Sequence, residues 1–260
     1  MYRDIYIRDG FITKKFEDQD LIPDIQDIIN KFFGDPILKK NISRLHVDEF
    51  HRLVYDCQCE INEMHPQERF YNSEREVLED INRDGELLRE SVCFLRAVRS
   101  QKAVKKDESL GMHRESMYHE IPEQAKVTFN AWFPLQNCVP ENMMRYIPGS
   151  HLIPDEQLLV RQLTKGDNIV KKGSFGHKLG FLYAPKEITH GINLKESVPF
   201  NLRTGEYVIF SAMLVHGGGI NGTGDTRFSM SMAMIPEDKI LLNKPYAAAD
   251  GKPHFCKFNV

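Results

Sequence analysis

The hydrophobic pattern of the chain changes near residue 100, and this change limits the folds that it can adopt. Before that point, apolar residues recur at three- and four-residue steps over residues 21–33 and 47–64, as on the buried face of a helix. A third helix is predicted to start at Ser73, whose side chain can cap the first amides, with Gly85 as a candidate break before the apolar face continues to Leu95. We therefore expect residues 1–100 to form a helical layer.

Short apolar or alternating segments separated by Gly, Pro and Asn follow, which is typical of antiparallel strands. Strands are predicted over residues 126–133, 206–210 and 228–235. A sheet that is open on one side must cover its apolar face, so the predicted fold class is α+β and mainly β: a β-sandwich or jelly roll buttressed by the N-terminal helices. Residues 154–200 are rich in Gly and Lys and carry few strand signals, so we expect a long loop that covers the substrate.

The length of 260 residues suits one β-rich domain, and we see no linker rich in Pro, Gly or Ser. A single domain over 1–260 is expected, with the jelly-roll core at 101–236. The C-terminal tail, 237–260, could pack on its own body or on a partner, which leaves a homodimer open.

Charge and cysteine content narrow the class of protein. A net charge of -3, from 34 basic and 37 acidic residues, gives no field that would hold nucleic acid or an anionic membrane. No apolar run approaches the ~20 residues of a membrane span, and the N-terminus has no apolar signal segment. Five irregularly spaced cysteines fit reduced thiols. We expect a cytoplasmic protein that binds neither nucleic acid nor membrane.

A set of metal-binding side chains is the clearest chemical signal. His113 and Glu115 are two residues apart, and on an extended segment such residues point to the same side. His216 follows an apolar strand and precedes three glycines. Two imidazoles and one carboxylate on one metal leave positions open, as in non-haem iron oxygenases. A His-x-Glu pair alone is weak, because 10 histidines make chance pairs common.

Arg227 and Ser229 would face the same side of one strand, eleven and thirteen residues after His216. A guanidinium and a hydroxyl are suited to a carboxylate in a partly dry site; the alternative is a surface salt bridge. The alternating strand 127–133 would place Thr128, Asn130 and Trp132 on one face, where they could line a ligand site.

Six motifs in this order resemble the phytanoyl-CoA dioxygenase family over about residues 105–236: His113-x-Glu115, Asn130-Ala-Trp132-Phe-Pro-Leu, Tyr146-Ile-Pro-Gly-Ser-His151, Gly205-Glu-Tyr-Val-Ile-Phe, His216-Gly-Gly-Gly-Ile-Asn221 and Arg227-Phe-Ser229. The resemblance implies a double-stranded β-helix core and Fe(II) on His113, Glu115 and His216. It also implies 2-oxoglutarate with its far carboxylate on Arg227, dioxygen as co-substrate, and succinate as a product.

The sequence has Glu115 where the family usually has Asp, which puts the metal geometry in doubt. Halogenating relatives replace this carboxylate by a small residue, so Glu115 favours hydroxylation. By the same resemblance His151 is near the site, although it could be a loop histidine bonded to backbone. Arg114 and Tyr118 could contact substrate, or Arg114 could simply be solvated.

Two other functions are open at this point. A cupin-like metalloenzyme without a 2-oxo acid would use the same metal ligands, but would not need the pair Arg227 and Ser229. A non-catalytic binding protein could retain the fold. For an oxygenase, the polar residues of 154–200 favour a small polar substrate, such as an amino acid, a sugar-like compound or another biosynthetic intermediate, and an acyl-CoA stays open.

Overall fold

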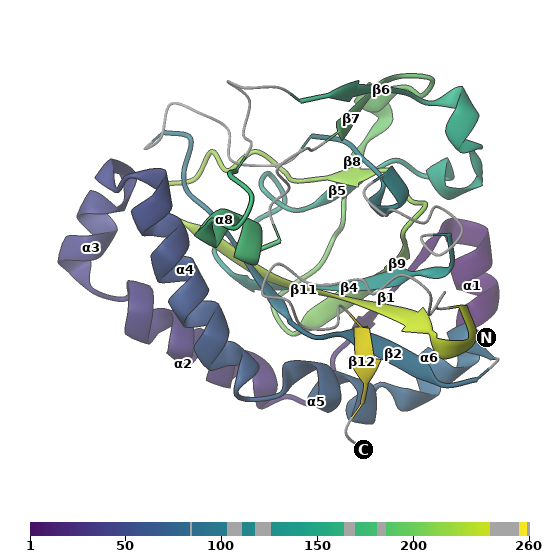
Figure 1. Cartoon of the computed structure of the whole chain (residues 1–260), viewed down its shortest axis with the longest axis horizontal. Coiled ribbons are helices and arrows are strands. Elements are labelled where there is room, and N and C mark those ends of the chain that lie inside the picture. The colour runs from purple at the N-terminus through teal and green to yellow at the C-terminus, as the bar shows by residue number, and fades with distance from the viewer. Residues whose placement is uncertain are drawn as a thin grey trace.

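A seven-stranded antiparallel sheet forms the centre of the molecule, with the strand order β1-β9-β4-β11-β2-β12 and with β3 also paired to β11 (Figure 1). The computed structural model describes residues 1–83, 85–102, 111–117, 126–163, 170–180, 186–239 and 255–258. The strands of this large sheet are β1 (Phe11–Lys15), β2 (Leu87–Glu90), β3 (Phe94–Val98), β4 (Phe129–Gln136), β9 (Glu206–Ser211), β11 (Arg227–Pro236) and β12 (Phe255–Lys257).

Two smaller sheets lie on the other side of the large sheet from the helices (Figure 1). One has the order β10-β5-β8, and the other is the pair β6-β7. Their strands are β5 (Arg145–Tyr146), β6 (Leu159–Gln162), β7 (Lys186–His190), β8 (Val198–Pro199) and β10 (His216–Gly217). The strand-rich architecture agrees with the predicted fold class.

Helices cover the outer side of the large sheet (Figure 1). They are α1 (Tyr2–Asp9), α2 (Leu21–Phe33), α3 (Pro36–Asn41), α4 (Val47–Asn62), α5 (Pro66–Ser73) and α6 (Arg75–Asn82). The short helix α8 (Phe175–Lys178) lies beside α4, on the side of the smaller sheets (Figure 1). The predicted stripes on α2 and α4 are buried, and His46 with Glu49 forms a capping box at the start of α4. Among the described residues, no helix combines the length and apolarity needed to cross a membrane.

The two faces of the large sheet differ because alternate residues of each strand point to opposite sides. On the outer face, apolar side chains pack with the helices into the main core; examples are Phe129, Phe133 and Met230. On the inner face, Trp132, Val208 and Phe210 belong to a second, smaller apolar cluster. We call these the outer face and the inner face below.

The prediction of a third helix running to Leu95 is wrong. The helix α6 ends at Asn82, and the following segment forms β2 and β3, which pair with β11. Ser73 is the last residue of α5 and caps nothing. Short apolar runs fit either periodicity, and here the available partner strand β11 decides the outcome. The first hundred residues therefore contribute three strands as well as helices.

The segment 154–200 contains more regular structure than predicted. The strands β6 and β7 pair with each other, and α8 lies against α4. The residues 164–169 and 181–185 of this segment lie outside the described residues. In the C-terminal tail, β12 pairs with β2, so this end of the chain returns to its own sheet.

Candidate metal centre

His113 and His216 face each other across a narrow antiparallel bridge between two segments far apart in the sequence. The amide of His113 donates to the carbonyl of His216 at 2.8 Å, and the reverse bond measures 2.9 Å. The two imidazole ring centroids are 4.4 Å apart. The pairing of the backbone therefore brings both rings to one place.

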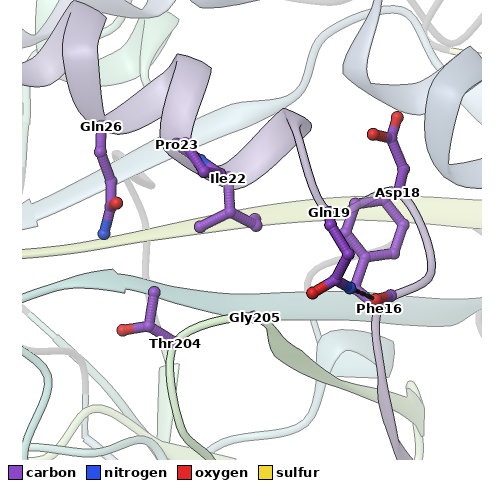
Figure 2. A pocket seen from close by; sticks show the side chains of 8 residues that line it. All are labelled: Phe16, Asp18, Gln19, Ile22, Pro23, Gln26, Thr204 and Gly205. Atoms are coloured by element: carbon purple, nitrogen blue, oxygen red, sulfur yellow. Dashed lines mark hydrogen bonds between the residues drawn. The ribbon is translucent and has the colours of Figure 1, made fainter.

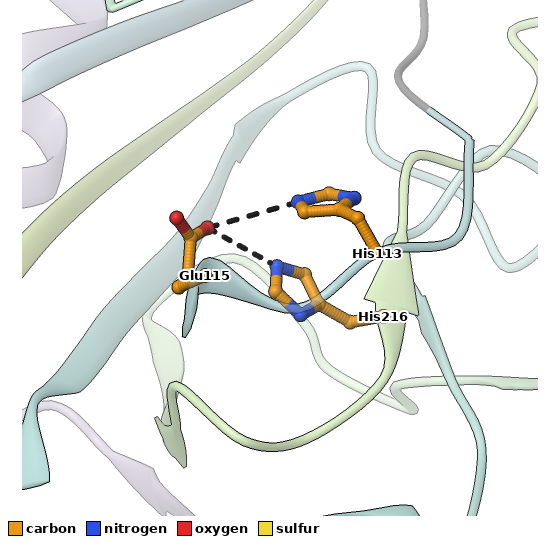
Figure 3. A group of neighbouring side chains, drawn as sticks. All are labelled: His113, Glu115 and His216. Carbon is orange, nitrogen blue, oxygen red and sulfur yellow. Dashed lines mark ion pairs between the residues drawn. The ribbon is translucent and has the colours of Figure 1, made fainter. Parts of the chain in front are cut away.

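Glu115 completes the group, with both Nε2 atoms directed at its carboxylate (Figure 3). Its Oε1 is 3.7 Å from Nε2 of His113 and 3.4 Å from Nε2 of His216. The expectation that an extended segment presents His113 and Glu115 on one side needs correction. Glu115 is the first residue of a 3-10 turn, Glu115–Met117, and the turn, not the pleat of a strand, directs its carboxylate to the histidines.

Hydrogen bonds on the far side of each ring fix which nitrogen is available to a metal. Nδ1 of His113 is 2.7 Å from the carbonyl oxygen of Gly111, and Nδ1 of His216 is 2.9 Å from that of Leu214. A carbonyl only accepts, so each Nδ1 carries the hydrogen, and in the neutral ring Nε2 keeps its lone pair. Metal-binding histidines are commonly oriented in this way.

Burial and charge favour the ionisation states that a metal requires. Burial, helped by the neighbouring His216, lowers the pKa of His113 and so favours the neutral imidazole. Burial opposes ionisation of Glu115, but the two neighbouring histidines outweigh it and hold the pKa of this carboxyl well below its usual range. The site therefore favours a neutral imidazole at His113 and a carboxylate at Glu115.

The donor set fits an open metal site. One ligand atom from each of the three residues lies within 4.8 Å of the others. The histidine side chains are 7% and 5% exposed, whereas that of Glu115 is 33% exposed, so the site is reachable from one side. Mixed nitrogen and oxygen donors without cysteine suit Fe(II) better than a closed structural zinc site.

Arg227 and Ser229 lie on β11 as predicted, with both side chains buried. Arg227 donates through Nη1 to the carbonyls of Asn142 and Gly219, which hold the guanidinium in place. The Ser229 hydroxyl is fully buried and has no hydrogen-bond partner among the described residues. A buried hydroxyl without a partner is costly, so this one fits a bound acceptor such as a carboxylate.

The strand β4 alternates as predicted around its tryptophan. Phe129, Ala131 and Phe133 belong to the main core, and Trp132 packs in the inner apolar cluster. Asn130 is 9% exposed, and its buried amide nitrogen has no partner in the described part of the chain. Thr128 is buried just before β4, where its carbonyl accepts from Ala212.

The structure places Arg114 and His151 away from the metal ligands. The guanidinium of Arg114 is fully buried against Ser150, Ile153 and Asp155. The ring of His151 bonds the carbonyl of Ile7, in α1, at 3.0 Å, which agrees with the alternative of a loop histidine bonded to backbone. Tyr118 lies outside the described residues.

Arg96 is an inner-face residue that the sequence reasoning missed. It lies opposite Ser229 in the pairing of β3 with β11, and its Nε donates to Ser231. Burial lowers the pKa of the Arg96 guanidinium, while the charge of Glu115 acts in the opposite direction. Arg96 and Glu115 therefore interact electrostatically. The alternation of Leu95 and Ala97 around Arg96 was the available signal, and the prediction of a helix obscured it.

A concavity elsewhere in the protein contains none of the candidate metal ligands (Figure 2). It lies where the start of α2 meets the turn Thr204–Gly205. Its two side-chain amides are engaged within the chain: Gln19 donates to the carbonyl of Phe16, and Gln26 to that of Leu135. We therefore place the chemistry at His113, Glu115 and His216.

Sequence comparison supplies independent information about this site. The family model described as phytanoyl-CoA dioxygenase (PhyH) matches residues 31–229, a span that contains all three candidate metal ligands and both Arg227 and Ser229. No curated protein matches the chain.

Three solved structures illustrate the similarity of fold. The non-haem α-ketoglutarate-dependent epimerase SnoN from nogalamycin biosynthesis is 15% identical, with a TM-score of 0.56 and coverage of 99% of this chain and 92% of that one. EvdO2 from Micromonospora carbonacea var. aurantiaca, in complex with 2-oxoglutarate, is 14% identical, with a TM-score of 0.57 and coverage of 90% and 89%. AviO1 from Streptomyces viridochromogenes Tue57 is 16% identical, with a TM-score of 0.54 and coverage of 91% and 94%. The jelly-roll fold class is thereby confirmed.

Proposed function

The chain belongs to the phytanoyl-CoA dioxygenase family of Fe(II)- and 2-oxoglutarate-dependent oxygenases, and from this premise we propose that it hydroxylates a small polar metabolite. In this reaction one oxygen atom of dioxygen enters the substrate and the other enters succinate, while 2-oxoglutarate loses CO2. Family membership gives the reaction class and its cofactors. The substrate and the residue roles are the proposed part.

One observation carries the proposal: Nε2 of His113, Nε2 of His216 and a carboxylate oxygen of Glu115 converge, each histidine being oriented by a backbone carbonyl. Orientation through Nδ1 is difficult to explain for histidines with a purely structural role, because either tautomer would then serve. An iron ion with 2-oxoglutarate would supply dioxygen activation and the oxidation itself.

The residues of the chain are suited to holding and orienting the co-substrate. Arg227 is fixed by two carbonyls, and the buried hydroxyl of Ser229 would complete a cradle for the far carboxylate of 2-oxoglutarate. The edge contact of Phe210 with His216, at a centroid distance of 4.7 Å, would keep water from one side of the metal ligands. Binding, orientation and exclusion of water are thus assigned to the inner face.

Glu115 favours hydroxylation over halogenation. Its carboxylate lies within 3.7 Å of both Nε2 atoms, which fills the position that a halide would need. The 3-10 turn at 115–117 would accommodate the additional methylene of Glu relative to Asp, because from this turn the carboxylate lies 3.7 and 3.4 Å from the two histidines.

The polar groups of the inner face support a small polar substrate. Arg96, Asn130 and Ser231 are all on strands that surround the site, and Arg96 interacts electrostatically with Glu115. A cation close to the metal ligands favours a substrate that carries an acidic group, such as an amino acid or another organic acid. SnoN, which has a similar fold, is an enzyme of nogalamycin biosynthesis, so a biosynthetic intermediate is the first substrate class to test.

The test is conversion of 2-oxoglutarate to succinate by the purified protein with Fe(II), in the presence of a metabolite extract. Mass spectrometry would follow succinate and any metabolite that gains 16 daltons. We expect both signals with the wild type and neither with His216→Ala, which lacks one metal ligand.

Two results would count against the proposal. Succinate formation that His216→Ala leaves unchanged would show that the metal lies elsewhere. Oxidation of a metabolite without consumption of 2-oxoglutarate would favour a cupin-like enzyme that uses no 2-oxo acid.

A further inference from the structure

Arg114 lies between the two sequence neighbours that bind the proposed metal, yet its side chain points away from them. It is among the largest fully buried side chains of the protein. Its Nη2 donates to the carbonyls of Ser150 and Ile153, the latter at 2.7 Å, and its Nη1 forms an ion pair with Asp155. All three partners belong to residues 147–155, which we call the clamp turn.

The clamp turn also holds the segment that carries the other metal ligand. The hydroxyl of Ser150 accepts from the amide of Val215 at 2.9 Å, and the amide of Ile147 donates to the carbonyl of Val215 at 2.9 Å. Val215 directly precedes His216. Ser150 therefore contacts both metal-binding segments, one through its carbonyl and the other through its hydroxyl.

Burial of the charged Arg114 guanidinium costs desolvation free energy, which a residue needed only for packing would not have to overcome. The Arg114 side chain is fully buried, so its charge is removed from water, and the ion pair with the partly exposed Asp155 compensates for this loss only in part. An apolar side chain of similar volume would fill the space without this desolvation. A guanidinium differs in offering a rigid planar fork of donors, which sets direction as well as distance.

We propose that Arg114 is a positioning residue for the metal centre, and that the clamp turn is its anchor. With the Arg114 side chain fixed on the clamp turn, the backbone between His113 and Glu115 is held where both side chains reach His216. This inference deepens the proposed function, because it rests on the metal site assigned there. It also gives a role to the Pro-Gly-Ser-His motif at 148–151, which holds the metal-binding segments rather than the substrate.

The test is the affinity of the protein for Co²⁺, measured by calorimetry without substrate or turnover, together with the midpoint of thermal unfolding. Arg114→Lys keeps the charge and removes the fork. We expect it to weaken Co²⁺ binding by about 10- to 100-fold, the usual range for residues that orient metal ligands.

Arg99→Lys is the matched control. Arg99 is also a buried arginine that donates to two backbone carbonyls, those of Ile42 and Leu45, but neither carbonyl belongs to the clamp turn or to a metal-binding segment. We expect this variant to lose thermal stability while its Co²⁺ affinity stays within about twofold of the wild type. Equal weakening in both variants would mean that Arg114 acts only through general stability and would overturn the inference.

A milder variant keeps the inference testable if Arg114→Lys does not fold. Ser150→Ala removes the bond to the Val215 amide and leaves the Ser150 carbonyl in place. We expect Co²⁺ binding to weaken by about tenfold, and unchanged affinity would contradict the clamp. Failure of the wild type to bind Co²⁺ would instead refute the metal centre itself, so the two claims fail separately.

Discussion

The two faces of β11 show how one strand serves two purposes. Phe228, Met230, Met232 and Met234 alternate along its outer face and pack with the helices in the main core. Arg227, Ser229 and Ser231 occupy the positions between them on the inner face. Neighbouring residues of one strand therefore belong to a hydrophobic core and to a candidate binding site.

The two faces separate the residues that stabilise the fold from the residues of the candidate site. The outer face buries apolar surface against helices and holds no polar group of the site. The inner face retains buried polar atoms without a partner among the described residues, namely on Asn130 and Ser229. Selection for stability alone would disfavour such atoms. Changes on the outer face should lower stability, and changes on the inner face should lower activity.

Removal of the Glu115 carboxylate should have the largest effect on activity and little effect on stability. We expect Glu115→Ala to lower succinate formation by more than about 100-fold, because the metal loses its only anionic protein ligand. Glu115→Asp should retain part of the activity, since it keeps the charge on a shorter side chain. Equal activity of Glu115→Ala and the wild type in a succinate assay would remove this residue from the site.

An outer-face substitution should show the opposite pattern. Met230 is 1% exposed in the main core, so Met230→Ala should lower the free energy of unfolding by about 2–5 kcal/mol through lost burial and a cavity. The measurement is urea unfolding. Succinate formation per folded molecule should be unchanged below the transition, and a large loss of activity there would show that the two faces are coupled.

Ser229→Ala should change binding of 2-oxoglutarate without destabilising the free protein. The hydroxyl has no partner among the described residues, so its removal should leave the free energy of unfolding equal or slightly higher. The KM for 2-oxoglutarate should rise by about tenfold, as expected for loss of one hydrogen bond to a carboxylate. An unchanged KM together with a marked loss of stability would reverse the assignment of this residue.

The smallest predicted effect concerns pH and lies on the helical side. A hydrogen bond from Arg69 lowers the pKa of Asp18, which joins the segment before α2 to α5. Because the folded protein prefers the ionised carboxyl, this stabilisation is present above the unfolded pKa of about 3.9 and is lost as the pH falls through the folded value. In Asp18→Asn, the midpoint of thermal unfolding should therefore decrease less than in the wild type as the pH falls below the unfolded pKa of about 3.9. The Co²⁺ affinity at neutral pH should be unchanged.

Much of the architecture could be predicted from sequence periodicity, and the predictions that were wrong have a physical cause. The stripes of α2 and α4, the alternation in β4 and the strands β9 and β11 were all predicted from the sequence. The short strands β2 and β3 were taken for helix, because four or five residues fit both patterns and only pairing with β11 distinguishes them. That error concealed Arg96.

The candidate metal ligands could be named from sequence, but their geometry could not. The motif identifies His113, Glu115 and His216, whereas the 3-10 turn at Glu115 and the carbonyl partners of both rings depend on tertiary contacts. Arg114 and His151 lie in recognisable motifs, yet their side chains are directed by the clamp turn and by α1, which no local pattern reveals.

The most direct test of the account is the visible absorption of the protein loaded with Fe(II) under anaerobic conditions and then titrated with 2-oxoglutarate. Chelation of ferrous iron by a 2-oxo acid produces a charge-transfer band, so the measurement reports metal and co-substrate at one site without any knowledge of the substrate. We expect a band that saturates at one equivalent, requires a higher concentration of 2-oxoglutarate in Ser229→Ala and is absent in His216→Ala. No band in the wild type, or an unaltered band in His216→Ala, would contradict the account.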